Sequence, residues 1–208
     1  MYTLLLLLIY LAFISLGLPD SLLGSAWPVM HKAFQVPLSY AGLVTMIISG
    51  GTICSSLMSE RLTKKFGTQI VTVFSVMLTA IALFGFSTAS AFWMLCLWAI
   101  PYGLGAGAID AALNNYVALH YNSRHMSWLH CFWGLGTIIS PYVMSYALTT
   151  SVWQNGYRMV SFIQIGITLI LFVTLPIWKV NKKETAQEEK AEEEMVGIKG
   201  ALKIKDVP

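Results

Sequence analysis

The sequence predicts an all-α, polytopic membrane protein with six transmembrane helices. Of its 208 residues, 56% are hydrophobic and only 11% are charged, whereas about a quarter of the residues of a soluble domain are charged. Each of six apolar runs is long enough to supply the ~20 residues that a spanning helix needs. None shows the strict alternation expected of a membrane strand. The runs lie near residues 3–28, 39–59, 68–88, 92–119, 127–149 and 157–178 and define one bundle over residues 1–179.

The orientation of the bundle follows from its basic residues, which gather in alternate connections. They follow the second, fourth and sixth runs, at Arg61, Lys64, Lys65, Arg124 and Lys179. By the positive-inside rule these connections face the cytoplasm, which places both termini of a plasma-membrane protein on the cytoplasmic side. The remaining segment, 180–208, is charged and contains no further span, so we expect a cytoplasmic linker there.

The first run carries a carboxylate, Asp20, in the stretch GLPDSLLG. Pro19 removes a backbone donor just before it, and the small and polar neighbours suit the wall of a cavity better than open lipid. Alternatively, the span ends at Leu18 and Asp20 lies at the outer headgroups. The apolar run continues through Trp27, which favours the cavity wall.

The second run ends in a charged segment, SSLMSERLTKKFGTQ, which we interpret as a short cytoplasmic loop before the third run. Its charged members are Glu60, Arg61, Lys64 and Lys65. An ordinary basic loop that sets topology also fits these residues. The third and sixth runs are predominantly apolar, and we expect them to be peripheral, with Gln164 the one strongly polar residue at the centre of the sixth.

The fourth run holds a second intramembrane carboxylate, Asp110, one turn before Asn114 on the same helical face. An Asp at the centre of a span costs about 2.5 to 3.5 kcal/mol on insertion scales, so Asp110 needs a partner or a use. Alternatively, Asp110 only forms hydrogen bonds with neighbouring helices. Gly103, Gly107 and Ala111 recur every four residues and predict a smooth face on which another helix packs closely.

The fifth run places His130, Trp133 and Thr137 on one helical stripe. An aromatic face that stacks, next to polar groups that fix orientation, suits a polar, ring-shaped ligand. Interhelical hydrogen bonding by His130 and simple packing of Trp133 remain the alternative.

Several function classes lack support in the sequence. Cys54, Cys96 and Cys131 lie singly inside spans, which suggests neither disulfides nor a metal site. No phosphate-binding loop, zinc-protease helix or nucleophile elbow occurs, so we expect no enzyme and no cofactor. The net charge of +3 comes from residues at helix ends and indicates no nucleic-acid partner.

Together, these stretches resemble the N-terminal six-helix half of a major facilitator superfamily transporter, and most nearly the fucose:proton symporter branch. The loop signature of the family is Gly, three residues, Asp-Arg, one residue, Gly and two bases. Here Ser56 and Thr63 replace its two glycines. The resemblance implies that Glu60, Arg61, Lys64 and Lys65 form a cytoplasmic gating loop, which latches neighbouring helix ends in one conformation and releases them in another.

The branch places one carboxylate on each of the first and fourth helices, one for substrate and one for the coupling proton. This implies that Asp110 carries the proton and Asp20 binds substrate hydroxyls, although the two roles can be exchanged. The remaining substrate-binding residues would be Asn114, His130, Trp133 and Thr137. The branch often has Glu on the fourth helix and amides on the fifth, so the departure here concerns the substrate more than the mechanism.

The resulting expectation is proton-coupled secondary transport of a small polar solute, a sugar first of all, by alternating access. The second half of the cavity would come from a C-terminal six-helix half in a longer chain, of which 180–208 starts the central loop, or from a second copy. The alternative is a six-helix scaffold or truncated remnant that transports nothing.

Overall fold

The structure is a computed structural model that describes residues 2–178, so the expected linker 180–208 lies outside the described residues. It confirms the all-α class: six helical segments are long and apolar enough to cross a membrane. Seven α-helices make these six spans because the first span is bent into two helices. The elements are α1 (Tyr2–Asp20), α2 (Leu22–Ala33), the 3-10 turn η1 (Leu38–Tyr40), α3 (Ala41–Phe66), α4 (Thr68–Thr88), α5 (Phe92–His120), α6 (Ser123–Thr150) and α7 (Trp153–Val173).

The break in the first span lies at Ser21, immediately after Asp20. Pro19 is its cause. A proline has no backbone N–H and its ring presses on the carbonyl of the residue four positions earlier, which here is Ser15. That carbonyl is satisfied from another helix: Gln164 Nε2 of α7 donates to it at 2.7 Å. The bend is thus stabilised from outside the span.

The charged segment after the second span is not a loop, so that prediction is wrong. α3 continues through Glu60, Arg61, Lys64 and Lys65 to Phe66, and Gly67 is its only link to α4. The segment is rich in good helix formers, and the i,i+4 pair of Glu60 and Lys64 closes at 2.6 Å. Gly67 has a φ of +87°, which lets the chain reverse in a single residue.

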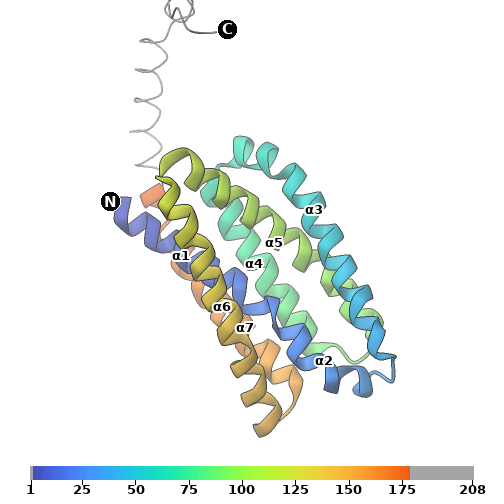
Figure 1. Cartoon of the computed structure of the whole chain (residues 1–208). Helices are drawn as coiled ribbons and strands as arrows, with labels where there is room; N and C mark the ends of the chain where they lie inside the picture. The colour runs from blue at the N-terminus through green and yellow to red at the C-terminus, as the bar shows by residue number, and fades with distance from the viewer. Residues whose placement is uncertain (1, 179–208) are drawn as a thin grey trace, which may run out of the picture.

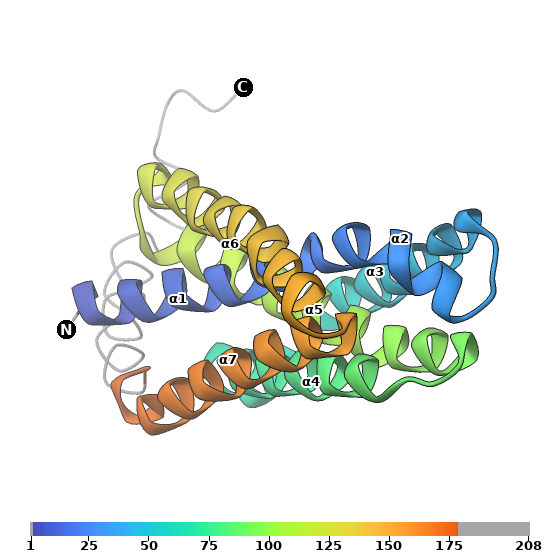
Figure 2. The same ribbon diagram turned by 90° about the horizontal axis from the view of Figure 1, so that it is seen from below.

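The helices form two groups, α3 with α4 and α5, and α1 with α2, α6 and α7, which are joined mainly by the packing of α4 on α7 (Figure 1). α3 packs along α5 at one edge, α4 packs on both α5 and α7, and α1 packs along α6. The same pairings of α4 with α7 and of α1 with α6 are visible from below (Figure 2). α3 and α6 are the least buried spans, with 11% and 22% of their central windows buried.

The smooth face predicted on α5 is confirmed at Gly103 and Gly107. A methyl group added at either position would overlap a backbone oxygen of α3, that of Ile48 or that of Thr52. Hydroxyl groups of α3 also donate to carbonyls of α5. Ser56 bonds to Gly107 at 3.1 Å and Ser59 to Ala108 at 3.2 Å. The hydroxyl of Thr52 is shared between Ile48 of its own helix, at 3.0 Å, and Gly103, at 3.3 Å. Close backbone approach and a row of hydrogen bonds therefore join the two helices.

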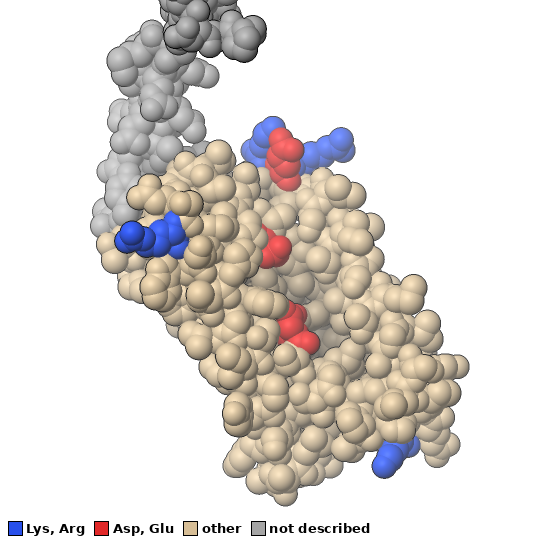
Figure 3. Space-filling model, viewed as in Figure 1, with Lys and Arg blue, Asp and Glu red and all other residues tan. Residues whose placement is uncertain are grey.

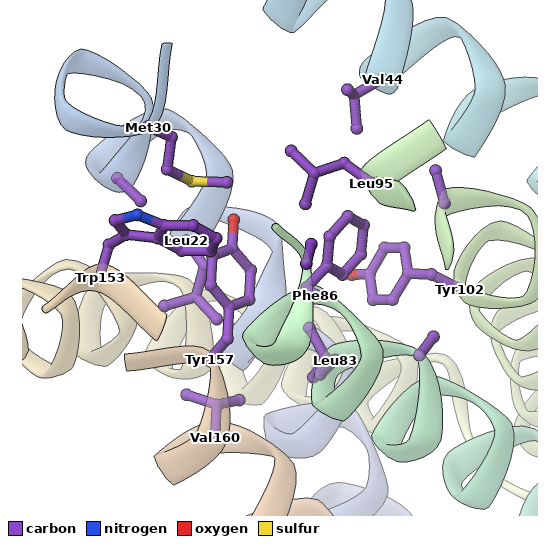
Figure 4. Close-up of a cluster of buried hydrophobic side chains, with 14 of the residues drawn as sticks. Leu22, Met30, Val44, Leu83, Phe86, Leu95, Tyr102, Trp153, Tyr157 and Val160 are labelled. Atoms are coloured by element: carbon purple, nitrogen blue, oxygen red, sulfur yellow. The ribbon is translucent and has the colours of Figure 1, made fainter. Parts of the chain in front are cut away.

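The interior consists of two apolar clusters with a polar layer between them. One cluster gathers side chains of α2, α4, α5 and α7, among them Leu22, Phe86 and Tyr157 (Figure 4). The other lies toward the opposite end of α1, α5 and α7. Between them, Thr79 and Gln164 lie inside the bundle, 3% and 1% exposed. The expectation that the helices carrying them are merely peripheral is therefore wrong: 67% of the α4 window is buried.

Candidate functional site

The carboxylate of Asp20 is held by donors from two other helices. Tyr102 Oη of α5 donates to Asp20 Oδ1 at 3.0 Å, and Trp133 Nε1 of α6 donates to Asp20 Oδ2 at 2.8 Å. Asp20 is the last residue of α1, at the break in the first span, and remains exposed. A charged acceptor thus lies at the meeting point of three helices, fixed in direction and still open to a ligand.

The second carboxylate, Asp110, lies on the adjoining stretch of α5. Asn114 Nδ2 donates to Asp110 Oδ1 at 3.0 Å, which confirms that the two share a face. His130 of α6 is close enough to Asp110 for an electrostatic interaction, and the ring of His130 meets Phe13 of α1 edge-on at 6.1 Å. Asp20 and Asp110 also interact electrostatically with each other. The two carboxylates therefore lie in one region of the molecule.

This site faces a hollow of the molecular surface. Figure 3 shows acidic groups in the hollowed middle of the face, with Lys and Arg only toward its margins. The two least buried helices also carry large apolar side chains that are more than 60% exposed, including Met46 and Ile53 of α3 and Ile138 and Tyr142 of α6. Two carboxylates with no Lys or Arg among the described residues beside them leave the hollow acidic.

Two glycines bring α1 and α6 close enough for the Trp133 bond. A methyl group at Gly17 would overlap the carbonyl oxygen of Trp133, and one at Gly136 would overlap that of Ile14. Thr137 lies at this seam, but its hydroxyl donates to Gly134 of its own helix at 2.8 Å. The structure thus brings Asp20, Trp133 and His130 of the predicted site together and turns the hydroxyl of Thr137 to the backbone.

The predicted gating residues lie apart from the carboxylates. Lys64 and Glu60 are exposed, so their ion pair is a weak surface contact. They line a cleft of about 780 Å³ between the ends of α3 and α5 and the start of α4, together with Gln69 and Asn115. The lining of the cleft includes neither Asp20 nor Asp110. No group of three or more His, Cys, Asp or Glu side chains arranged for a metal ion occurs in residues 2–178.

Sequence reasoning missed Tyr102, although it stands beside Pro101 in the stretch that carries Asp110. Its side chain is 4% exposed, and its ring packs edge-on against Phe86 at 6.3 Å. A buried phenol usually finds a hydrogen-bond partner. A tyrosine in an otherwise apolar half of a predicted span was therefore the sequence signal for this residue. The partner itself is set by helix packing, which the sequence does not display.

The substitution Tyr102→Phe should lower the free energy of unfolding by about 1.5 to 3 kcal/mol, because the lost hydrogen bond is to a charged acceptor. The phenyl ring keeps the contact with Phe86, and only the donor to Asp20 is lost. Chemical unfolding in detergent, followed by circular dichroism, measures the change. Tyr142→Phe is the matched control because that tyrosine is 74% exposed. Equal stability of the Tyr102 variant and the wild type would show that the bond contributes nothing.

One family model matches most of the chain. The model that describes the Major Facilitator Superfamily matches residues 9–206. The chain belongs to the Major Facilitator Superfamily. This confirms the family to which the sequence was assigned by resemblance, and it makes the chain a multi-pass membrane protein. Members of the superfamily are transporters rather than enzymes.

Two curated proteins are similar to this chain at low sequence identity. "Bypass of stop codon protein 6" of Saccharomyces cerevisiae is 23% identical over 163 residues, which are 77% of this chain and 33% of that protein. The "Glucose/mannose transporter GlcP" of Bacillus subtilis is 22% identical over 182 residues, 86% of this chain and 44% of that protein. The chain thus matches less than half the length of either relative.

Proposed function

We propose that this chain supplies the N-terminal half of a proton-coupled secondary transporter for a small polar solute, a sugar first of all. The observation that carries the proposal is the Asp20 carboxylate, held by Tyr102 and Trp133 at 3.0 and 2.8 Å and open to the hollow. A carboxylate accepts hydrogen bonds from sugar hydroxyls, and the Trp133 ring beside it, 38% exposed, offers a stacking surface.

Asp110 is the proton carrier in this proposal. It lies half-buried on α5, bonded to Asn114 and within electrostatic reach of Asp20 and His130. A carboxyl group in a cavity that alternately opens to the two sides can bind a proton on one side and release it on the other. Asn114 and His130 complete the binding wall. The printed name of the Bacillus subtilis relative supports a sugar as the solute.

The broad apolar faces of α3 and α6 are the surfaces for a second six-helix half, either in a longer chain or in a second copy. Members of the superfamily pair two such halves around a central site. Both termini would face the cytoplasm of the plasma membrane, and Glu60, Arg61, Lys64 and Lys65 at the end of α3 would make the gating contacts there.

Asp20→Asn tests the binding role. In the complete protein reconstituted in lipid vesicles, the variant should bind glucose or mannose about 10- to 100-fold more weakly, because a hydrogen bond to a charged acceptor is worth about 1.5 to 3 kcal/mol. Equilibrium binding of the labelled sugars measures the change. Arg158→Gln alters a charge at the exposed end of α7, away from the site, and is the control.

Undiminished binding by the Asp20 variant would remove this carboxylate from the site. If the wild-type protein neither binds nor moves any solute tested, and both Asp20→Asn and Asp110→Asn leave it unchanged, the alternative of a non-transporting scaffold or remnant replaces the proposal.

A further inference from the structure

Gln164 is the most deeply buried polar side chain that joins three helices. It lies on α7, 1% exposed, in the polar layer between the two apolar clusters. Its Nε2 donates to the Ser15 carbonyl of α1 at 2.7 Å, and Thr79 Oγ1 of α4 lies 3.1 Å from its Oε1. The Ser15 carbonyl can only accept, so it fixes the amide with its donor end toward α1. The single hydroxyl proton of Thr79 is shared between Gln164 and the Val76 carbonyl of α4, which lies 2.8 Å away.

The carbonyl that Gln164 binds is one that the helix itself cannot satisfy. Residue 19 would normally donate to Ser15, but it is proline. An unsatisfied buried carbonyl is costly, and a bent helix persists only where another group takes over the missing bond. Gln164 therefore acts at the point where α1 changes direction.

Asp20 lies directly beyond that point. It follows Ser15 by five residues, about 7.5 Å along a helix, and it ends α1. The angle of α1 at Pro19 consequently decides where the carboxylate lies relative to Tyr102 and Trp133. We propose that Gln164, through its bond to the Ser15 carbonyl, is a positioning residue that holds the Asp20 carboxylate in its binding geometry. This inference rests on the proposed function for its effect on solute affinity, but its geometric part can be tested without a solute.

The geometric test follows the indole N–H of Trp133, which reports its bond to Asp20. In the complete protein, labelled with 15N-tryptophan in lipid nanodiscs, the resonance is assigned by its loss in Trp133→Phe. Gln164→Leu removes the donor at similar volume and should shift this resonance. Ser161→Ala is the matched control: it removes a buried bond of 2.8 Å from α7 to Ala80 of α4 but leaves α1 untouched. The control should leave the resonance in place.

A double variant separates positioning from mere stability. Pro19→Ala restores a backbone donor to Ser15, so Pro19→Ala/Gln164→Leu leaves no orphan carbonyl and should regain wild-type stability even if Gln164→Leu alone fails to fold. Because the helix is then no longer bent by the proline, we expect the Trp133 resonance to stay shifted and sugar binding to stay about tenfold weaker.

Return of both the resonance and the sugar affinity in the double variant would overturn the inference, as would an unshifted resonance in Gln164→Leu. A shifted resonance in a protein whose wild type binds no sugar would instead support the positioning role and refute the proposed function.

Discussion

Asp110→Asn should abolish the accumulation of solute against its gradient while leaving exchange down the gradient intact. The substituted amide keeps an oxygen that accepts the bond from Asn114, now 3.0 Å long, so the wall of the hollow is preserved. It cannot bind or release a proton in the physiological range. One pH unit is worth about 1.4 kcal/mol per proton, which sustains about tenfold accumulation with one coupled proton. The variant should reach equal concentrations and no more.

The measurement uses the complete protein in vesicles with an imposed pH gradient, compared with exchange of labelled sugar without a gradient. The two assays on one preparation serve as mutual controls, since a misfolded variant would lose both. Tenfold accumulation by the variant would assign the proton to another group, and Asp20 would be the next carboxylate to test. Loss of both activities in a variant whose circular dichroism spectrum matches that of the wild type would make Asp110 a binding residue.

Gly136→Ala should destabilise the bundle by about 3 kcal/mol, the upper part of the usual range for overpacking. The added methyl group would overlap the carbonyl oxygen of Ile14 and lie 2.9 Å from the backbone nitrogen of Leu18. These are backbone atoms of α1, which cannot rotate away as a side chain can. The two helices must separate, and the bond between Trp133 and Asp20 should lengthen with them.

Gly134→Ala provides a control on the same helix. A methyl group there meets no atom within 4 Å, so the substitution should be neutral or stabilising by up to about 1 kcal/mol through its better helix propensity. Unfolding in detergent measures both variants. Equal stability of the two would mean that α1 and α6 tolerate separation and that their glycine seam does not define the site.

The spans could be predicted because apolar runs of this length are typical of transmembrane helices. The pairing of Asp110 with Asn114 on the fourth span followed from helical spacing alone. The partners of Asp20 were not. Tyr102 and Trp133 lie 82 and 113 positions from Asp20 in the sequence. Only the crossing of α1, α5 and α6 brings them to its two carboxylate oxygens. Local spacing carries no information about such crossings.

Two predictions failed for a common reason. The Glu60–Lys65 segment was assigned to a loop because it is charged, and the third and sixth spans were assigned to the periphery because they are apolar. Polarity reports the surrounding solvent and not the backbone conformation or the number of neighbours. α3 continues into the charged segment because its residues favour helix, and Gln164 lies at the centre of the bundle because the bend at Pro19 needs its donor.

The single-residue link at Gly67 has a consequence for how the protein is made. α3 and α4 form a hairpin, yet each packs far more extensively on α5 than on the other. α5 begins only at Phe92, after both have been synthesised. When the hairpin first enters the membrane, α5, the main packing partner of both helices, is still missing. The hydroxyls of Thr52, Ser56 and Ser59 therefore cannot yet contact α5. We therefore expect this hairpin to reach its final packing only after α5 has entered the membrane.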